Sequence, residues 1–299
     1  MRSQRCVLGI DVGGTTIKAR LEDETGALLA SRRVATPRDD PSAQRLAEAI
    51  ARLATEAVGG GRLDAVGLVV PGIVDVAAGR SVLAVNLGWR DVPVVDRVRA
   101  ALSTASLDAP IAFGQDVRAG ALAESHGVGG PGAGPVVFLP IGTGLAAAVI
   151  DGGDILFPDG WSGEIGQLRL KHPPFHGQRV EEVASASAFA TAAGASDARE
   201  AVGRLDAGDP AAVAAFAATV AALAEVIVWS CAVLGGRRVV IGGGLAEAGD
   251  RLLGPLRAAV SDCLGGLPAI DVRRARHGDE AGAIGAAILA RRLLDRSAP

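Results

Sequence analysis

The sequence predicts an α/β protein built from two domains, and three observations support this prediction. The chain has 299 residues, more than one hydrophobic core usually serves, so two domains with a cleft between them are expected. Apolar runs typical of strands alternate with helical patterns as far as residue 113. Two segments, 8–26 and 136–153, share one pattern, in which two strands flank a turn rich in glycine and threonine.

The first α/β segment ends near residue 113. Residues 41–58 have apolar side chains at helical spacing and end at a glycine run. Residues 71–91 are interpreted as a loop that contains Gly79, Arg80 and the sequence Asn-Leu-Gly-Trp. After the first hairpin, the predicted elements are strand 28–36, helix 41–58, strand 64–70, helix 92–104 and strand 109–113.

The second part of the chain starts with a helix predicted over 117–126 and a connector over 127–135. Residues 127–132 formally match the GxGxxG pattern of dinucleotide-binding proteins. That pattern has to follow a strand and open a helix, whereas here it follows a helix and opens a strand, so the match is rejected. The remaining prediction is the second hairpin, a loop-rich stretch 154–180, helices within 183–234, strand 237–241, turn 242–244 and a last helix over about 279–294.

The turn in LGIDVGGTTIK, residues 8–18, has the composition of a phosphate-binding loop. Glycine lets backbone N–H groups approach an anion closely, and threonine hydroxyls add uncharged donors. Asp11 then lies where a phosphate-bound Mg²⁺ would need a carboxylate. A tight hairpin turn without a ligand is the alternative. The Gly-Thr-Gly turn at 142–144 favours the functional interpretation, because two such hairpins could bind one nucleotide from opposite sides.

Asp116 stands at a junction between a predicted strand and a predicted helix. In a doubly wound sheet such a junction lies at the edge where ligands bind. Asp also favours the N-cap of a helix, and the two roles can coexist. A carboxylate here can receive the proton of a hydroxyl that attacks a phosphoryl group, which is the main chemical task that phosphoryl transfer asks of a protein.

Two further glycine-rich segments are candidate binding loops. In residues 161–167, Glu164 and Gln167 stand three residues apart between glycines, and such groups can bind neighbouring hydroxyls; a solvated acidic turn is the alternative. Residues 242–244, Gly-Gly-Gly, follow an apolar strand and would allow a flat or phosphorylated ligand to approach the backbone. Simple packing between strand and helix explains that turn equally well.

Composition excludes several classes of protein. A net charge of −3 and 49% hydrophobic residues describe a soluble globular protein without the basic surface of a nucleic-acid partner. Three scattered cysteines without a CxxC pair argue for a reducing compartment, which predicts the cytoplasm. The first residues do not resemble a signal peptide. The apolar stretch 211–236 contains Glu225 and is expected to be a buried helix, so no membrane is implied.

The sequence gives little support for a zinc site. His172 and His176 are separated by Pro-Pro-Phe, which rules out a helical pair of ligands one turn apart, and no cysteine is nearby to complete a tetrahedral set.

Taken together, these segments resemble the ROK family of repressors and sugar kinases, in the superfamily of actin and hexokinase. Five motifs carry the resemblance across nearly the whole chain: DVGGTTIK, Gln115-Asp116, Ile141-Gly142-Thr143-Gly144, Gly163-Glu164-Ile165-Gly166 and Gly242-Gly243-Gly244. The resemblance implies an actin-like (ribonuclease H-like) fold of two α/β domains that close on ATP and a sugar. It places residues 1–114 with about 282–299 in a smaller domain, because the last helix returns to it, and 115–281 in a larger one.

The resemblance also assigns roles to residues. Asp116 is the base that activates a sugar hydroxyl, and Asp11 supports Mg²⁺, through water. The residues that it implies for ATP are Gly13, Gly14, Thr15, Thr16, Lys18, Gly142, Thr143, Gly144, Gly243 and Gly244. Those that it implies for the substrate are Asn86, Gln115, Asp116, Glu164, Gln167 and Glu181, the last from a Glu-Glu-Val-Ala-Ser stretch similar to the family's Glu-Ala-Tyr-Ala-Ser. Family likeness further suggests a homodimer.

Departures from the family pattern concern the acceptor. Gln115 replaces the usual Asn, Gln167 replaces the usual His, and KHPPFHGQRV stands where the family has a cysteine-rich zinc segment. In the family that His both ligates zinc and contacts the sugar near its anomeric carbon, so no zinc is expected here. The predicted function is therefore an ATP-dependent kinase of a hexose, as in a glucokinase, or of a sugar-like polyol. A C7-cyclitol kinase and a sugar-sensing regulator without catalysis are the alternatives.

Overall fold

A computed structural model describes residues 5–126, 134–158, 160–171, 175–236 and 238–296. Its contacts divide the chain into two compact units. Unit 1 contains Met1–Ala123, Phe157–Trp161 and Asp279–Pro299, and unit 2 contains Glu124–Leu156 and Ser162–Gly278. The expected boundaries at residues 114 and 281 lie within a helix length of these positions. The difference arises mostly because unit 1 retains the helix that starts at Asp116.

Unit 1 is built on a five-stranded sheet with the order β3-β2-β1-β4-β8. Strands β1, β4 and β8 run parallel, whereas β2 and β3 are antiparallel additions that extend the first hairpin. The bounds are β1 Cys6–Val12, β2 Thr16–Asp23, β3 Leu28–Ala35, β4 Ala65–Val70 and β8 Ile111–Gln115. The predicted hairpin and strands therefore appear in the structure.

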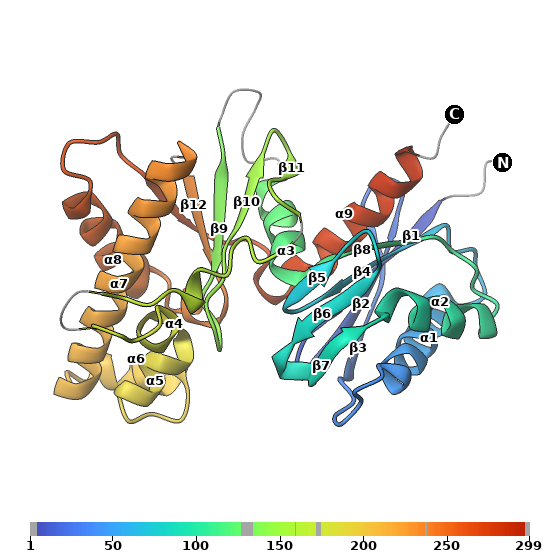
Figure 1. Cartoon of the computed structure of the whole chain (residues 1–299), viewed down its shortest axis with the longest axis horizontal. Helices are drawn as coiled ribbons and strands as arrows, with labels where there is room; N and C mark the ends of the chain where they lie inside the picture. The colour runs from blue at the N-terminus through green and yellow to red at the C-terminus, as the bar shows by residue number, and fades with distance from the viewer. Residues whose placement is uncertain (1–4, 127–133, 159, 172–174, 237, 297–299) are drawn as a thin grey trace. The chain divides into compact units, whose positions relative to one another are not determined.

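Helices cover both faces of this sheet. Successive side chains of a strand point to opposite faces, so Leu8 and Ile10 of β1 pack with α1 (Gln44–Val58) and α2 (Val94–Thr104). Val7 points the other way and packs with α9 (Ala281–Arg296). In Figure 1, α1 and α2 lie on one side of the strands and α9 on the other. Ala287 and Ala290 of α9 pack with Val7 of β1 and Ala65 of β4.

A small second sheet in unit 1 was missed. It has the order β5-β6-β7, with β5 Ile73–Asp75, β6 Arg80–Ala84 and β7 Trp89–Val92, and a short 3₁₀ helix, η1 (Val85–Leu87), interrupts it. The interpretation of residues 71–91 as a loop is therefore wrong. Strands of three to five residues are too short to show a clear alternation, and the turns at Gly79 and Gly88 dominated the pattern.

Unit 2 contains a second five-stranded sheet with the order β11-β10-β9-β12-β13. The bounds are β9 Val136–Pro140, β10 Ala148–Asp151, β11 Asp154–Ile155, β12 Arg238–Gly242 and β13 Asp271–Arg274. The central pair, β9 and β12, is parallel, and β9 and β10 form the predicted second hairpin. Strand β13 was not predicted, because the edge strand has only four residues and its Arg-Arg end carries no apolar pattern.

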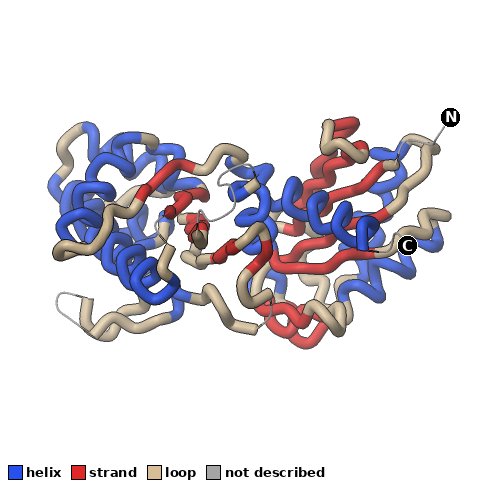
Figure 2. Tube along the Cα trace, turned by 90° about the horizontal axis from the view of Figure 1, so that it is seen from above, coloured by secondary structure: helices blue, strands red, loops and turns tan. Residues whose placement is uncertain are grey.

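Helices pack on the sheet of unit 2 (Figures 1 and 2). Their bounds are α4 Glu181–Ala184, α5 Ala186–Ala192, α6 Ala198–Asp206, α7 Pro210–Leu234 and α8 Asp250–Cys263, of which α8 was not predicted. Phe189 of α5 meets Phe216 of α7 edge to face, with ring centroids 5.7 Å apart. By length and composition α7 could cross a membrane, but half of its most apolar window is buried in the unit. Its place is that of a core helix.

The helix α9 approaches the first sheet so closely that only glycine fits at the contact. A Cβ atom on Gly67 of β4 would lie 1.8 Å from the carbonyl oxygen of Ala286. On α9 itself, a Cβ atom on Gly285 would lie 1.8 Å from the carbonyl oxygen of Ala119 in α3 (Asp116–Ser125). Backbone thus packs against backbone on both sides of this helix.

We expect Gly67→Ala to lower the free energy of unfolding by about 1–3 kcal/mol, because the added methyl group overpacks this contact. Calorimetry should show a lower Tm. The matched control is Gly203→Ala in α6, where a Cβ atom would meet nothing within 4 Å; it should raise stability by about 0.5–1 kcal/mol. A Gly67→Ala protein as stable as the wild type would contradict the close packing of α9.

Candidate functional site

Parallel strands of unit 1 bring two predicted carboxylates to one edge of the sheet. Asp11 stands near the end of β1 and pairs in register with Val69 of β4, which in turn pairs with Gly114 of β8. Neighbouring strands are about 4.8 Å apart, so Asp11 and Gly114 lie about 10 Å from each other across the sheet. Asp116 begins α3 two residues later. This edge is where ligands bind in open α/β sheets.

The turn after β1 presents unused donors. Thr36 donates its main-chain N–H to the carbonyl of Thr15 (3.0 Å) and its hydroxyl to the carbonyl of Gly13 (2.7 Å). The N–H groups of Gly14 and Thr15 make no hydrogen bond within the described residues, and both residues are exposed. The carbonyls of Gly13 and Thr15 are therefore hydrogen-bonded to Thr36, and the N–H groups of Gly14 and Thr15 remain available to a ligand, as in a loop that binds an anion. Thr16 begins β2, where its carbonyl accepts from the N–H of Gly13.

Asp11 is a buried carboxylate with partial charge compensation. Burial raises its pKa to about 6, the ammonium group of Lys18 opposes this shift, and the nearby Glu280 and Asp279 add to it. The Lys18 Nζ atom is 3.7 Å from a carboxylate oxygen of Asp11 and also 3.7 Å from one of Asp279, and it donates to the carbonyl of Asp279. Arg33 in turn pairs with Asp279 and Glu280.

Lys18 thus belongs to a network that joins the first hairpin to the start of α9. Its role toward ATP stays a prediction. Asp279 and Arg33 were not among the predicted residues, and the local sequence gives no signal for them, because Lys18 and Asp279 are 261 positions apart.

At the start of α3, the predicted Asp116 and Gln115 both cap the helix. A carboxylate oxygen of Asp116 accepts from the N–H of Val117 (2.8 Å), and the amide oxygen of the buried Gln115 accepts from the N–H of Arg118 (2.9 Å). Capping satisfies helix N–H groups that have no partner within the helix. Asp116 remains half-buried, so the capping role expected as an alternative is present beside the one proposed for catalysis.

A hollow of about 730 Å³ opens beside this turn. It is lined by Gly14, Pro37, Arg38, Asp39, Asp40, Pro41, Asn86, Leu87 and Gly88. The predicted substrate residue Asn86 is exposed, and its Cβ atom lies 3.5 Å from the position of a Cβ atom on Gly14. The structure therefore brings Asn86 next to the predicted phosphate-binding turn, within unit 1.

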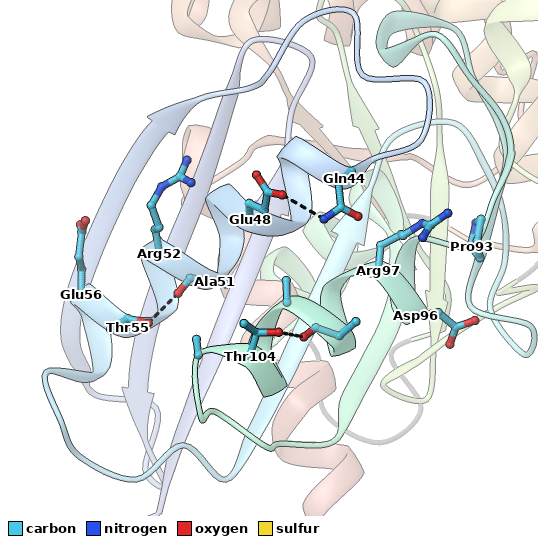
Figure 3. A pocket seen from close by; sticks show the side chains of 13 residues that line it. Gln44, Glu48, Ala51, Arg52, Thr55, Glu56, Pro93, Asp96, Arg97 and Thr104 are labelled. Carbon is cyan, nitrogen blue, oxygen red and sulfur yellow. Dashed lines mark hydrogen bonds between the residues drawn. The ribbon is translucent and has the colours of Figure 1, made fainter.

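A second hollow in unit 1, of about 940 Å³, lies between α1 and α2 and contains none of the predicted residues. Figure 3 shows that none of the hydrogen bonds drawn there joins the two helices. In α1, Gln44 bonds Glu48 and Thr55 bonds the carbonyl of Ala51, and in α2, Thr104 bonds the carbonyl of Ala100. Small residues form much of its lining. Its size exceeds that of the hollow at Asn86, and its lining combines alanines with charged and polar side chains of both helices.

In unit 2 the two remaining glycine turns follow neighbouring parallel strands. Gly242 of β12 pairs with Pro140 of β9, so Gly142-Thr143-Gly144 and Gly243-Gly244 leave the sheet side by side. Hydrogen bonds join them: the N–H of Ile141 donates to the carbonyl of Gly242 (2.8 Å), and that of Leu245 donates to the carbonyl of Ile141 (3.1 Å). A Cβ atom on Gly243 would lie 2.5 Å from the Ile141 oxygen, so only glycine fits there.

Three polar side chains meet beside these turns. The amide nitrogen of Gln167 donates to a carboxylate oxygen of Glu181 (3.0 Å), and Arg179 donates to the amide oxygen of Gln167 (2.9 Å) and to Glu181 (2.8 Å). The other oxygen of Glu181 is 3.1 Å from the position of a Cβ atom on Gly144. Glu181 therefore lies between the Gly-Thr-Gly turn and the segment of Glu164, which caps the 3₁₀ helix η2 (Ile165–Gln167).

Arg179 was not predicted, since a lone arginine in a loop carries no recognisable pattern. The residues around it form a short hairpin in which Arg169 and Arg179 are paired. His172 lies outside the described residues. Within the described ranges, no group of three or more His, Cys, Asp or Glu side chains could hold a metal ion. The expected absence of zinc stays a prediction.

Several known proteins with similar sequence and structure are sugar kinases. The family model "ROK family" matches residues 7–293. A glucokinase of Halalkalibacterium halodurans is 29% identical over 317 aligned positions that cover 95% of this chain and 94% of the relative. The crystal structure of a ROK hexokinase from Thermus thermophilus matches with a TM-score of 0.81 at 30% identity, over 97% of this chain and 99% of that one.

A ROK glucokinase from Streptomyces griseus, solved with glucose and AMPPNP, matches with a TM-score of 0.78 at 27% identity, over 96% of this chain and 99% of that one. The predicted family resemblance and the actin-like α/β fold are confirmed by these matches.

The pKa of Asp11 leads to a prediction about stability. The folded protein keeps the proton of the Asp11 carboxyl group up to about pH 6, whereas the unfolded chain releases it near pH 4. Rising pH therefore lowers the free energy of unfolding between these two values, by about 3 kcal/mol in total. Asp11→Asn has no such proton. In urea unfolding of metal-free and nucleotide-free protein, its stability relative to the wild type should increase by that amount from pH 4 to pH 7.

Asp108→Asn changes an exposed carboxylate and serves as the control for the effect of an Asp→Asn substitution on urea unfolding. If the wild type and the Asp11→Asn variant changed in parallel with pH, Asp11 would not carry a raised pKa.

Proposed function

The chain belongs to the ROK family, and from this membership we propose that it transfers the γ-phosphoryl group of ATP to a hydroxyl of a hexose, as a glucokinase does. One observation carries the proposal. Asp116 and the turn with free N–H groups at Gly14 and Thr15 stand at the same edge of one sheet, where its parallel strands β1 and β8 end. A base for the acceptor and donors for the transferred group are the two elements that this reaction requires.

In the proposed reaction, Asp116 accepts the proton of the acceptor hydroxyl while the oxygen of that hydroxyl bonds to the γ-phosphorus. The bond from that phosphorus to the bridging oxygen breaks, and ADP leaves. The N–H groups of Gly14 and Thr15 stabilise negative charge on the phosphoryl oxygens. Gly13 is the first residue of this turn, where its carbonyl is bound to Thr36, so the backbone is already ordered for the ligand.

Unit 2 supplies the remaining contacts in this proposal. Gly142, Thr143 and Gly144, with Gly243 and Gly244, bind ATP through their backbone. Support comes from the hydrogen bonds that fix the two turns to each other. Glu164, Gln167 and Glu181 bind acceptor hydroxyls, and support comes from the position of Glu181 between the segments of Gly144 and Gly166.

Mg²⁺ fits the residues of unit 1. Asp11 is a buried carboxylate whose charge Lys18 compensates only in part, as its raised pKa shows, and carboxylate oxygen is a preferred ligand of Mg²⁺ or of its bound water. When bound with ATP, the ion neutralises negative charge on the phosphates. Asp11 would orient it from the end of β1.

Selectivity for the acceptor is where this chain departs from its relatives. Both ends of the Gln167 amide are bound, to Arg179 and to Glu181. This fixed amide favours a second candidate substrate, a carbocyclic analogue such as a C7-cyclitol, which has no anomeric hydroxyl to recognise. Free cysteines and the use of ATP support a cytoplasmic location.

A panel of glucose, other hexoses, amino sugars and cyclitols, each tested with ATP and Mg²⁺, examines the proposal. We expect ADP release with at least one acceptor, and Asp116→Asn should reduce kcat by about 10²–10⁴-fold, because the base is lost. ATP binding, measured by calorimetry, should change less than about twofold, since the base touches the acceptor rather than the nucleotide. NMR of the product identifies the phosphorylated hydroxyl.

The exposed carboxylate of Asp108 again serves as control, and Asp108→Asn should keep full turnover. A chain that binds a sugar but releases no ADP with any acceptor would fit the sugar-sensing regulator instead. Undiminished turnover by Asp116→Asn would remove Asp116 from its assigned role.

The outer face of α7 supports a homodimer. Trp229 and Val233, one turn apart, are 72% and 80% exposed, and Glu225 is the single charged residue in the 25-residue helix. Exposed apolar patches of this kind commonly mark protein interfaces. We propose that a second copy of the chain covers this face.

Sedimentation equilibrium tests the homodimer. Trp229→Glu should shift the protein from dimer to monomer, because it places a charge at the centre of the apolar face. Leu267→Glu alters another exposed apolar residue of unit 2, 56% exposed, and should leave the dimer intact. A wild type that sediments as a monomer, or a dimer unaffected by Trp229→Glu, would refute this assignment.

A further inference from the structure

Arg118 is a buried arginine in the first turn of α3, two residues after Asp116. Only 5% of its surface is exposed. A guanidinium group stays charged in proteins, and charged groups are rarely buried without partners that satisfy their donors. The contacts of the Arg118 guanidinium group therefore indicate what this residue does beside Asp116.

The guanidinium group binds a distant segment of the chain. Its Nη1 atom donates to the carbonyl of Pro158 (2.5 Å) and its Nη2 atom to that of Gly160 (3.0 Å). At its other end, the main-chain N–H donates to Gln115. Each of these two carbonyls accepts one hydrogen bond from the buried guanidinium group. A shift of the segment would break these two hydrogen bonds of a buried charged group, which costs free energy.

The bound segment, Phe157–Trp161, belongs to unit 1, although the chain before and after it belongs to unit 2. Its described residues are exposed, with Phe157 at 61% and Trp161 at 74%. Burial of its side chains therefore contributes little to keeping the segment in unit 1. Two hydrogen bonds from Arg118 tie the segment to α3 of unit 1.

The segment leads directly into the turn that carries Glu164. Glu164 is three positions after Trp161, a span of at most about 11 Å of extended chain. Beyond the segment, the carbonyl of Gly163 accepts from the N–H of Ala147 (2.8 Å), and a Cβ atom on Gly163 would lie 1.9 Å from the Ala147 oxygen. The chain is thus held on both sides of Ser162, by Arg118 before it and by Ala147 after it.

We propose that Arg118 is a positioning residue for the acceptor substrate. By holding the carbonyls of Pro158 and Gly160, it fixes the path on which the chain enters the Glu164 turn, from the same helix turn that carries the base. The inference rests on the proposed function, in which Asp116 is the base and Glu164 binds acceptor hydroxyls. It predicts that Arg118 affects the acceptor and leaves ATP binding almost unchanged.

Steady-state kinetics of Arg118→Met and Arg118→Lys test this role, with the acceptor that the wild type phosphorylates fastest in the panel. Arg118→Met keeps length but removes the donors, and we expect its kcat/KM for the acceptor to fall by about 10- to 100-fold, because small displacements of reacting groups have effects of that size. The KM for ATP should change less than twofold. Arg118→Lys, which retains a charged donor, should recover part of the loss, and added methylguanidinium should restore part of it to Arg118→Ala.

Arg257 provides the matched control. It also donates a guanidinium hydrogen bond to a carbonyl, that of Val272 (2.9 Å), but within α8 and β13 of unit 2. Arg257→Met should keep both KM values. Arg118→Met with unchanged acceptor kinetics, or with equal losses toward acceptor and ATP, would overturn the inference.

Hydrogen exchange gives a readout that does not depend on turnover. Amides of the described residues between Phe157 and Glu164 should exchange faster in Arg118→Met than in the wild type, and those of β9 and β12 should not change. Uniformly faster exchange would indicate a general loss of stability and would overturn the assignment. If the wild type phosphorylates no acceptor, the proposed function fails, whereas an active wild type with an unaffected Arg118→Met variant refutes this inference alone.

Discussion

Parallel strand pairing is the constraint on which both halves of the candidate site depend. In unit 1 the pairing of β1, β4 and β8 places the ends of these strands at one edge, where Asp11 and Asp116 stand. In unit 2 the pairing of β9 with β12 does the same for the two glycine turns. Each motif is local in sequence, but only the shared direction of the strands gathers the motifs. A reversal of β8, for example, would send Asp116 to the opposite end of the sheet.

Features that arise from adjacent residues could be predicted. The turns at Gly13 and Gly142 and the return of α9 follow from glycine content, apolar spacing and the family pattern, and all three are present. The sheet β5-β6-β7 could not be recognised, because its strands are too short for an alternating pattern. Contacts across long distances in sequence, such as that of Lys18 with Asp279, leave no local signal.

The polar residues of the candidate site are held by contacts with one another. Lys18, Asp279 and Arg33 form a charged network beside Asp11, and Arg179 and Gln167 hold Glu181. Phosphoryl transfer needs little covalent chemistry from the protein and depends mainly on position and electrostatics. Fixing these side chains through their neighbours reduces the entropy that binding would otherwise lose. Asp279, Arg33 and Arg179, which were not predicted, thus order the predicted residues that they contact.

Substrate selectivity follows from the same arrangement. The amide of Gln167 already binds Arg179 and Glu181, so a substrate hydroxyl reaches it only by sharing or replacing one of these hydrogen bonds. An imidazole that binds a metal through one nitrogen would keep its other nitrogen free for a substrate hydroxyl. Both polar atoms of the Gln167 amide are instead already hydrogen-bonded. The second oxygen of Glu181 lies beside the Gly144 turn, which binds ATP in the proposed function. In the proposed function, recognition is therefore weighted toward hydroxyls near the transferred phosphoryl group, and we propose that a ring without an anomeric hydroxyl would lose little by binding to these residues.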